Sequence, residues 1–372
     1  MDLRFTDAEE AFRTEVRSWL EANVPHDLPS GDTRDGFALH LDWERKLFDK
    51  RWAVVSWPRE YGGREASLIE WLIFEEEYYR AGGPQRVTQN GIFLLAPTVF
   101  EFGTEDQKDR ILPRMAAAQD LWCQGWSEPN AGSDLAAIKS TAKRDDGGWR
   151  LTGQKTWTTR GAFCTHLFGL FRTDPEAERH RGMTYFLVPL DADGVTVRGF
   201  GRLDGDEGFA EVFFEDVFVP DGDVLGEVDK GWNVAMATTG SERGLTLRSP
   251  GRFMATAARL VELWRERPDP SVDDDLVACW MDAEAYRWQT YATVARLMEG
   301  AKPGAEASLT KLFWSELDVR LHETALRLLG PDAELEAPWM KGFQFALAGP
   351  IYAGTNEIQR NVVGERVLGL PR

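Results

Sequence analysis

The sequence predicts an α+β protein in which helical segments at both ends of the chain flank a β-rich middle. Apolar residues recur at helical spacing up to about residue 120 and again after residue 229, while short β-like runs separated by turn residues fill the stretch between them. The 372 residues are also too many for one simple core. We therefore expect a helical domain over 1–120, a β-barrel or sandwich over 121–228 and a helical bundle over 229–372.

The first third of the chain carries the local signals of helices. Thr6 and Glu9 form a capping-box pattern, in which each side chain bonds the backbone N–H of the other residue. The apolar residues that follow recur at helical spacing and predict one buried face: Phe12, Val16, Trp19 and Leu20. Further helices are expected over 37–52, 67–79 and 107–118.

The middle third of the chain has the sequence pattern of β-strands separated by turns. Asp145, Asp146, Gly147 and Gly148 form a hairpin-turn signal between strands expected at 138–144 and 149–159. Later strands are expected at 166–171, 184–189, 195–200 and 211–219. Helical spacing then resumes, and the helices expected after Gly231 include 253–266, 274–299, 305–329 and 356–367.

Composition narrows the class of protein. A net charge of −18 argues against nucleic acid or an anionic membrane as the main partner. The three cysteines, Cys123, Cys164 and Cys279, follow no metal-ligand spacing and are expected to be thiols in a reducing cytoplasm. No signal peptide opens the chain, and no apolar run approaches the about 18–20 residues that span a bilayer. We expect a cytoplasmic protein without a metal site.

Three segments have the composition of a binding site. Residues 126–134 form a turn rich in hydroxyls and Gly that suits ring-edge hydrogen bonding or anion contact, or else a polar loop between domains. Residues 153–161 form a strand in which Trp157 stands beside two Thr, either to flank a flat ring or to fill a core. In residues 351–360 a Gly-Thr turn opens a helix, and the N–H groups at its start suit a phosphate or a carbonyl. The alternative is an ordinary capped helix that binds no ligand.

Together these segments resemble the acyl-CoA dehydrogenase family, and so do residues 58–63 and 102–108. The resemblance covers nearly the whole chain. It implies an N-terminal helical domain, a central β-domain and a C-terminal four-helix bundle, with FAD bound outside a Rossmann fold. No Gly-x-Gly-x-x-Gly pattern follows a strand here, which agrees with that expectation.

The resemblance assigns roles to individual positions. The expected FAD contacts are Gln124, Trp126, Ser127, Ser133, Trp157, Thr158, Thr159, Arg267, Thr355, Asn356 and Glu357. The expected substrate contacts are Ser133, Ser241, Arg243 and Gly354. The reaction implied is α,β-dehydrogenation of an acyl-CoA thioester, with electrons passed to an electron-transfer flavoprotein.

The catalytic base is the main departure from the family pattern. Many members carry Glu between Tyr and Gly of the C-terminal motif, where this chain has Ala353, and a methyl group takes no proton. Other members place the Glu just before an Arg on a C-terminal helix, which here is Glu242 before Arg243. We therefore expect Glu242 to remove the α-proton while a hydride passes to flavin N5, although a structural Glu paired with Arg243 is the other interpretation. The backbone N–H of Ala353 still suits polarisation of the thioester carbonyl.

Two further motifs are degenerate. Residues 267–271 keep only the Arg of the family's Arg-x-x-Phe-Gly, and residues 327–331 replace its Gln-x-x-Gly-Gly. Both serve the adenosine-diphosphate half of FAD across a subunit interface in the family. This asymmetry resembles the heteromeric dehydrogenases of actinobacterial sterol-side-chain catabolism. A heterotetramer with a sister subunit thus stands beside a homodimer or homotetramer.

Other functions share this fold. One is a flavin N-oxygenase or an acyl-carrier-protein dehydrogenase, and another is a catalytically silent partner subunit, which Ala353 motivates. The retained Glu242-Arg243 pair favours dehydrogenation. The retained Trp157 and Thr159 argue against a silent subunit, which would not need ring contacts.

Overall fold

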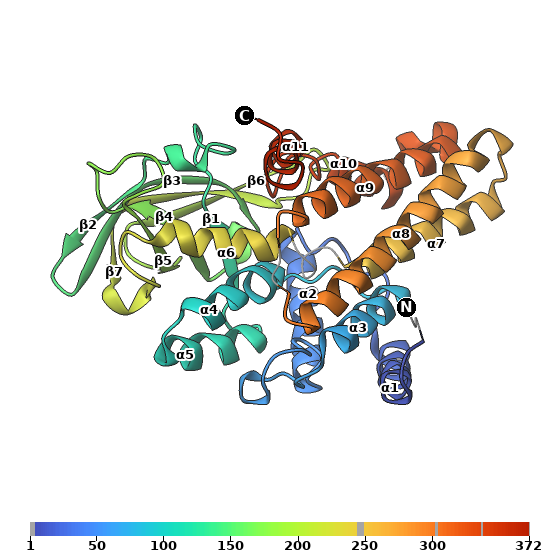
Figure 1. The fold of residues 1–372 in the computed structure, drawn as a ribbon, viewed down its shortest axis with the longest axis horizontal. Coiled ribbons are helices and arrows are strands. Elements are labelled where there is room, and N and C mark those ends of the chain that lie inside the picture. Colours follow the sequence, from blue (N-terminus) through green and yellow to red (C-terminus); the bar gives the residue numbers. More distant parts are fainter. Residues whose placement is uncertain (1–3, 244–248, 302–303, 336–337, 372) are drawn as a thin grey trace. The chain divides into compact units, whose positions relative to one another are not determined.

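The chain forms two compact units in a computed structural model that describes residues 4–243, 249–301, 304–335 and 338–371 (Figure 1). The first, called the helical unit here, comprises Met1–His26, Glu65–Pro84 and Arg243–Arg372. The second, called the sheet unit, comprises Asp27–Arg64 and Gln85–Glu242.

One mixed sheet of eight strands organises the sheet unit. The strand order is β6-β7-β3-β2-β4-β5-β8, and β1 pairs in parallel with β4. The strands are β1 (Trp122–Gly125), β2 (Thr141–Asp145), β3 (Gly148–Thr159), β4 (His166–Arg172), β5 (Met183–Pro189), β6 (Val195–Phe200), β7 (Phe209–Pro220) and β8 (Val224–Leu225). The strands expected from the sequence are present, whereas β1 was too short to be recognised.

The predicted hairpin is confirmed. β2 and β3 pair antiparallel with Asp145 opposite Gly148, and Gly147 takes a φ of +70°, which glycine adopts without steric cost. The sheet core combines aliphatic and aromatic side chains, and Phe171 is in edge-to-face contact with both Phe186 and Phe214. The alternating apolar positions of the strands therefore face one shared core.

Helices lie beside this sheet in Figure 1. The sheet unit contains α2 (Arg34–Asp49), the π-helix η2 (Asn90–Leu95), α4 (Ala96–Phe102), α5 (Glu105–Ala116) and α6 (Gly231–Arg243). Gln107 of α5 donates to the backbone oxygens of Gly222 and Val224 at 2.9 and 2.8 Å. The hydroxyls of Thr98 on α4 and Thr238 on α6 lie 2.8 Å apart.

The η2 and α4 segments were not predicted from the sequence. Nearly all of their residues are buried or half-buried, so no apolar stripe with a helical period distinguishes one face of the helix from another. The short α10 in the helical unit escaped recognition as well. Its residues outside Ala346 are mostly half-buried on every side.

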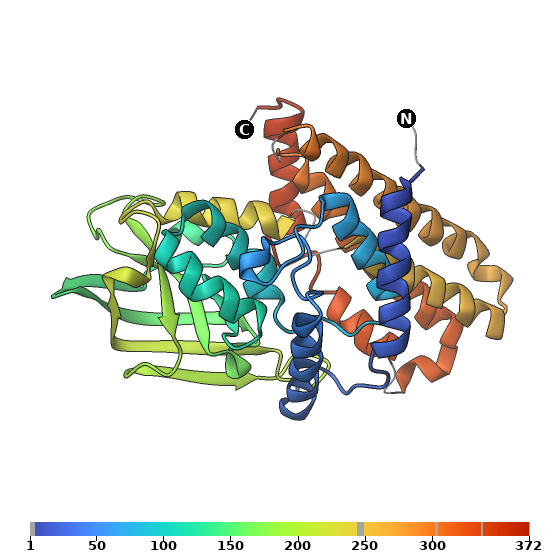
Figure 2. The same cartoon turned by 90° about the horizontal axis from the view of Figure 1, so that it is seen from below.

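The helical unit consists of α1 (Asp7–Asn23), α3 (Leu68–Arg80), α7 (Pro250–Glu266), α8 (Asp273–Met298), α9 (Ala307–Leu329), α10 (Pro338–Ala346) and α11 (Asn356–Val362). The capping box predicted at Thr6 and Glu9 opens α1, and a second one at Ser67 and Glu70 opens α3. Figure 2 shows α1 alongside α3, and the two helices are in contact.

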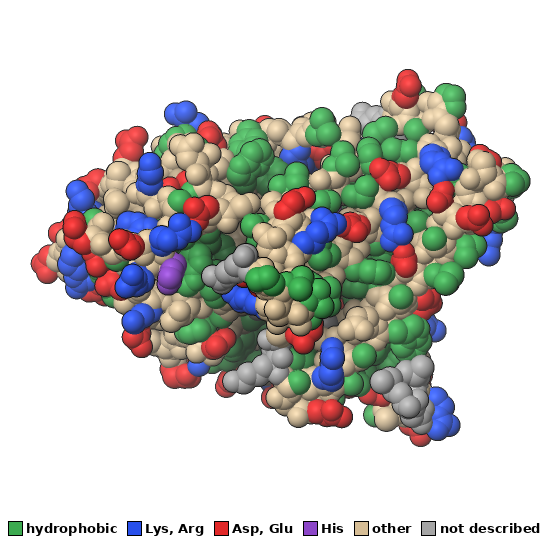
Figure 3. All heavy atoms as spheres, turned by 45° about the horizontal axis from the view of Figure 1, so that its top comes forward, with side chains coloured by type: hydrophobic (Ala, Val, Ile, Leu, Met, Phe, Trp, Pro, Cys, Tyr) green, Lys and Arg blue, Asp and Glu red, His purple; other side chains and the backbone are tan. Residues whose placement is uncertain are grey.

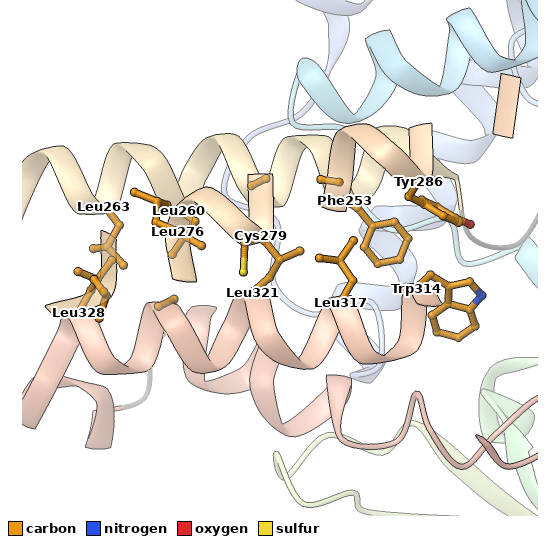
Figure 4. Packing of buried hydrophobic residues seen from close by; sticks show 14 residues of the cluster. Phe253, Leu260, Leu263, Leu276, Cys279, Tyr286, Trp314, Leu317, Leu321 and Leu328 are labelled. Carbon is orange, nitrogen blue, oxygen red and sulfur yellow. The ribbon is translucent and has the colours of Figure 1, made fainter. Parts of the chain in front are cut away.

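The core of the helical unit lies between α7, α8 and α9 (Figure 4). Side chains from the three helices point toward one another, among them Phe253, Leu260, Tyr286, Leu317 and Leu321. Phe253 meets Tyr286 edge to face at 5.3 Å between ring centroids. The helical periods read from the sequence thus become buried faces through packing, the main source of helix stability in proteins.

Several absences hold for the described part of the chain. No group of His, Cys, Asp and Glu there is arranged to hold a metal ion. No helix among these residues is long and apolar enough to cross a bilayer. Cys123, Cys164 and Cys279 are free. On the face drawn in Figure 3, acidic and basic side chains are interspersed, so this face presents no single basic surface.

Candidate functional site

Two of the predicted segments meet in the sheet unit. Gln124 lies on β1, Trp126 and Ser127 follow it directly, and Trp157 to Thr159 end β3. The backbone N–H of Thr156 donates to the oxygen of Ser127 at 2.9 Å. The loop after β1 and the end of β3 therefore form one surface, although some 30 residues separate them in the chain.

A buried ion pair joins the same two segments. Lys155 is fully buried, and its ammonium donates to Glu128 at 2.9 Å and to the Leu170 oxygen at 2.7 Å. Glu128 also accepts from the backbone N–H groups of Lys139 and Ser140, at 2.6 and 2.9 Å. Each charge is thus satisfied by several hydrogen bonds, as a buried charge requires.

The pKa values of the pair reflect this environment. Burial lowers the pKa of the Lys155 ammonium to about 8, because Glu128 offsets only part of the lost hydration. Burial alone would raise the pKa of Glu128, but Lys155 and the backbone donors hold it below its usual value. Both groups are therefore charged at neutral pH.

Trp157 forms an exposed aromatic platform. The pairing of β3 with β7 shifts by one residue between Lys155 and Thr158, which marks a β-bulge. Trp157 lies in this bulge with a left-handed φ of +57°, and 61% of its surface is exposed. Its indole meets Phe200 and Phe209 edge to face, at 5.4 and 5.6 Å between centroids. The bulge turns Trp157 out of the core, so the alternative in which Trp157 fills a core is wrong.

On the same two segments, three buried polar atoms have no hydrogen-bond partner among the described residues. They are Gln124 Nε2, Trp126 Nε1 and Thr158 Oγ1. An unsatisfied buried polar group costs about 1–3 kcal/mol, so each such group calls for an explanation. A flat ligand with an apolar face would cover the exposed indole of Trp157, and nitrogen and oxygen atoms at its edge suit the O–H and N–H groups of these segments. The residues present therefore fit an isoalloxazine ring.

The loop over 126–134 is less exposed than the sequence suggested. Trp126, Glu128 and Ala131 are buried, because Glu128 reaches inward to Lys155 and pairs through its backbone with Ala131. Ser133 remains exposed. The loop is thus a fixed structure with an exposed tip, and its predicted hydroxyl and N–H groups lie partly on that tip.

The third segment lies in the helical unit. Thr355 caps α11 through its hydroxyl, which accepts from the Ile358 N–H at 3.3 Å. Asn356 is buried, and its side-chain oxygen accepts from Lys311 at 2.6 Å and from Ser315 at 3.1 Å. Glu357 is exposed. Asn356 therefore fixes this segment to α9 rather than extending toward solvent.

The turn before α11 is tightly bonded. Ala353 and Gly354 have left-handed φ angles of +57° and +79°. The side chain of Gln359, itself buried, donates to the oxygens of both residues at 3.2 and 3.3 Å. The position that carries a Glu in many relatives of the resembled family thus holds a strained alanine whose conformation is fixed by hydrogen bonds.

The two degenerate segments meet in the helical unit. Arg267 donates to Asp332 at 2.7 Å and to the Leu329 oxygen at 3.4 Å. Arg327 pairs with Asp275 and donates to the Ser271 oxygen at 3.1 Å. Both arginines are therefore already paired with a carboxylate of the same chain.

The candidate base is only partly described. Glu242, with Ser241 and Arg243, forms the last turn of α6, and the side chains of these three residues lie outside the described part of the structure. The preceding turn is anchored, because the Thr238 hydroxyl lies 2.8 Å from Thr98 and 3.4 Å from the Tyr185 hydroxyl.

Sequence reasoning missed the Lys155–Glu128 pair. A lysine inside an expected strand was a usable signal, because an ammonium that is buried there needs a carboxylate. No local pattern identifies that carboxylate among the many in the chain. The pairing follows from how the loop folds over the strand.

Known proteins resemble the chain along its whole length. The family models for the N-terminal, middle and C-terminal domains of acyl-CoA dehydrogenases match residues 6–119, 123–217 and 229–368. The acyl-CoA dehydrogenase IpdE1 of Mycobacterium tuberculosis is 39% identical over 386 aligned residues, which cover 98% of each chain.

Two solved structures of paired chains share the fold. The Tcur3481-Tcur3483 steroid ACAD superposes with a TM-score of 0.89 at 27% identity, covering 100% of both chains. The ChsE4-ChsE5 complex from Mycobacterium tuberculosis superposes with a TM-score of 0.85 at 29% identity, again covering 100% of both chains.

Proposed function

The chain belongs to the acyl-CoA dehydrogenase family, and from this premise we propose that it oxidises an acyl-CoA thioester between its α and β carbons. The cofactor of the family is FAD. The observation that carries the proposal is the exposed Trp157, on the same segments as three polar atoms of Gln124, Trp126 and Thr158 that have no partner among the described residues. A flavin ring supplies both the aromatic face and the edge atoms that this surface lacks.

Each residue of the surface has a separate task. Trp157 supports the ring from one side, and Thr158 and Trp126 supply an O–H and an N–H for its edge. Ser127 and Thr159 are half-buried beside them and offer further hydroxyls. Bound FAD supplies the acceptor for the hydride that leaves the β-carbon. The protein's contribution is to hold the ring and exclude water from it.

We assign the base to Glu242. Ala353 has no ionisable group, so the proton of the α-carbon needs another acceptor. Glu242 follows the anchored Thr238 by one turn of α6, so packing on the sheet unit fixes its backbone position. The change from Glu to Ala keeps a backbone N–H at position 353, and a backbone donor to the thioester carbonyl needs no side chain.

Replacement of the base tests this assignment. Glu242→Gln keeps the shape of the side chain and removes the proton acceptor, so turnover should fall by about 10²- to 10⁴-fold while FAD stays bound. Glu227→Gln makes the same change at an exposed residue of the sheet unit and should leave the rate unchanged. The assay is anaerobic bleaching of the flavin by a panel of acyl-CoAs, followed by transfer to an electron-transfer flavoprotein. Near-normal bleaching by Glu242→Gln would remove Glu242 from the mechanism.

We further propose that the enzyme works as a heteromer with a sister dehydrogenase subunit. The carboxylates of Asp332 and Asp275 already pair with Arg267 and Arg327, the two cations left in the segments that bind the FAD diphosphate of a neighbouring subunit in the family. A phosphate would have to displace these carboxylates. The chain therefore suits the ring half of FAD better than the diphosphate half. The two solved relatives are themselves complexes of two different chains.

The stoichiometry of FAD decides between homomer and heteromer. The chain purified alone should hold FAD weakly, and coexpression with a sister subunit should give about one tightly bound FAD for each pair of chains. Visible absorption together with the mass of the complex in solution measures both quantities. One tightly bound FAD on every copy of the chain purified alone would refute the need for a sister subunit.

A further inference from the structure

A buried network of charges connects the chain segments that carry the aromatic platform of the sheet unit. Asp32 is 4% exposed and accepts from Arg160 Nε at 2.5 Å and from Arg202. Arg202 also pairs with Asp204 at 2.7 Å. Burial alone would raise the pKa of Asp32, yet the two guanidinium groups hold it below its ordinary value. Asp32 is therefore ionised and shared between two cations.

Arg160 is only three residues from Trp157 and, like it, has a left-handed backbone. The φ angles are +56° at Arg160 and +57° at Trp157. A left-handed conformation costs about 1–2 kcal/mol for a residue with a Cβ, and such residues persist only where the surroundings hold them. Neither Arg nor Trp is among the residue types that favour this region. The end of β3 thus carries two strained residues around Thr158 and Thr159.

The contacts of Arg160 fix this strained end. Its Nη1 donates to the Arg86 oxygen at 3.2 Å, and its backbone N–H donates to the Gly208 oxygen at 2.9 Å. Three residues later, Phe163 stacks on Phe37 of α2 at 5.0 Å between centroids. Arg160 is 3% exposed, so its guanidinium reaches these partners without competition from water.

Arg202 connects the network to the segment between the two rings that contact Trp157. It follows Phe200, one of the two rings against which Trp157 packs. A Cβ on Gly208 would lie 2.3 Å from Arg202 Nη1, so the guanidinium is seated against the chain just before Phe209, the second ring. Asp32 thereby connects the strand that carries Trp157 to the loop between the two phenylalanines that flank it.

We propose that Asp32, through Arg160 and Arg202, is the positioning residue that holds Trp157, Thr158 and Thr159 in the geometry that receives the flavin ring. The inference rests on the proposed function, because it takes this surface to be the flavin site. Asp32 itself contacts no flavin atom. It acts through two arginines that fix the two sides of the platform.

Two measurements test the proposal, and one of them needs no cofactor. In the complete protein without FAD, Asp32→Asn should speed amide hydrogen exchange in the peptide covering 154–163 by about tenfold or more, because the Arg160 guanidinium loses the carboxylate that holds the end of β3 in place. The β4–β5 hairpin serves as the internal reference. With FAD, the same variant should bind the cofactor about tenfold or more weakly and alter its visible spectrum.

The controls separate positioning from general destabilisation. Glu77→Gln removes a carboxylate from three arginines in the helical unit, and should lower stability without changing FAD affinity or exchange at 154–163. Asp32→Glu keeps the charge and should restore part of both signals. Arg202→Gln removes one cation and leaves Asp32 paired with Arg160. It provides the test if Asp32→Asn does not fold, with an effect in the same direction.

Each outcome has a distinct meaning. Wild-type exchange over 154–163 in Asp32→Asn and Arg202→Gln, or equal acceleration in Glu77→Gln, overturns the positioning role. Faster amide exchange confined to 154–163 together with unchanged FAD affinity also overturns it. The end of β3 would then loosen without any effect on binding of the flavin ring. Failure of the wild-type protein to take up FAD, alone or with a sister subunit, refutes the proposed function instead.

Discussion

The buried pair of Lys155 and Glu128 offers the sharpest test of the site's architecture. Lys155→Met removes a buried ammonium and leaves Glu128 with two backbone donors, while the Leu170 oxygen loses its donor. Glu128→Leu is more severe, because it strands the Lys155 ammonium together with the N–H groups of Lys139 and Ser140. The contacts therefore predict unequal losses from the two halves of one ion pair.

The magnitudes follow from these counts of stranded groups. Removal of one partner of a buried pair costs about 3–5 kcal/mol, and each orphaned buried hydrogen-bonding group costs about 1–3 kcal/mol. We expect Lys155→Met near the lower limit, about 3 kcal/mol, and Glu128→Leu at about 5 kcal/mol or more. The double variant should lose no more than Glu128→Leu alone, because the stranded ammonium is then gone. The effects of contacting groups are not additive.

Thermal and urea unfolding of the FAD-free protein measure these losses. At about 2–4 °C per kcal/mol for a unit of this size, Lys155→Met should lower the melting temperature of the sheet unit by about 10 °C, and Glu128→Leu by more. A double variant whose loss equals the sum of the single losses would refute the reasoning. So would a Lys155→Met protein as stable as the wild type, because the ammonium would then contribute nothing to holding the loop on β3.

Three further outcomes are expected. Since the pKa of Lys155 falls from 10.5 to about 8 on folding, the folded state releases its proton first. The free energy of unfolding of the wild type, relative to that of Lys155→Met, should therefore rise by up to about 3 kcal/mol between pH 8 and 10.5. Urea titrations in which this difference stays constant over that pH range would contradict the prediction. Burial alone would raise the pKa of Glu77, but the bonds from Arg17, Arg80 and Arg13 lower it to about 2. The ionised Glu77 should therefore stabilise the folded state by roughly 3 kcal/mol at neutral pH, and this stabilisation should be lost as the pH falls from 4.5 toward 2. In acid unfolding, the difference in free energy of unfolding between the wild type and Glu77→Gln should narrow, and a widening difference would contradict the prediction. Ala353→Gly relieves a left-handed alanine and should raise the free energy of unfolding by up to about 1 kcal/mol, and a lower melting temperature would show that the turn is not strained.

Several elements were predictable because their determinants are local. The capping box of Thr6 and Glu9, the turn at Gly147 and the periodic face of α1 each depend on residues within a few positions of one another. The α4 segment was not predictable, because a helix buried on most sides has no polar face to give its apolar pattern a period. Strand β1 has only four residues, which is too few for its period to be read.

The candidate site also has features set by the local sequence and features set by tertiary packing. The sequence by itself named the residue types and their order, from Gln124 and Trp126 to Thr158, and the family they belong to. The exposure of Trp157 was decided by tertiary structure, because a one-residue bulge against β7 reverses the side on which every later side chain of a strand falls. The partners of the buried charges were decided there too. Asp32 lies 128 residues from Arg160, and only the packing of the folded chain brings a carboxylate to a cation that water no longer reaches.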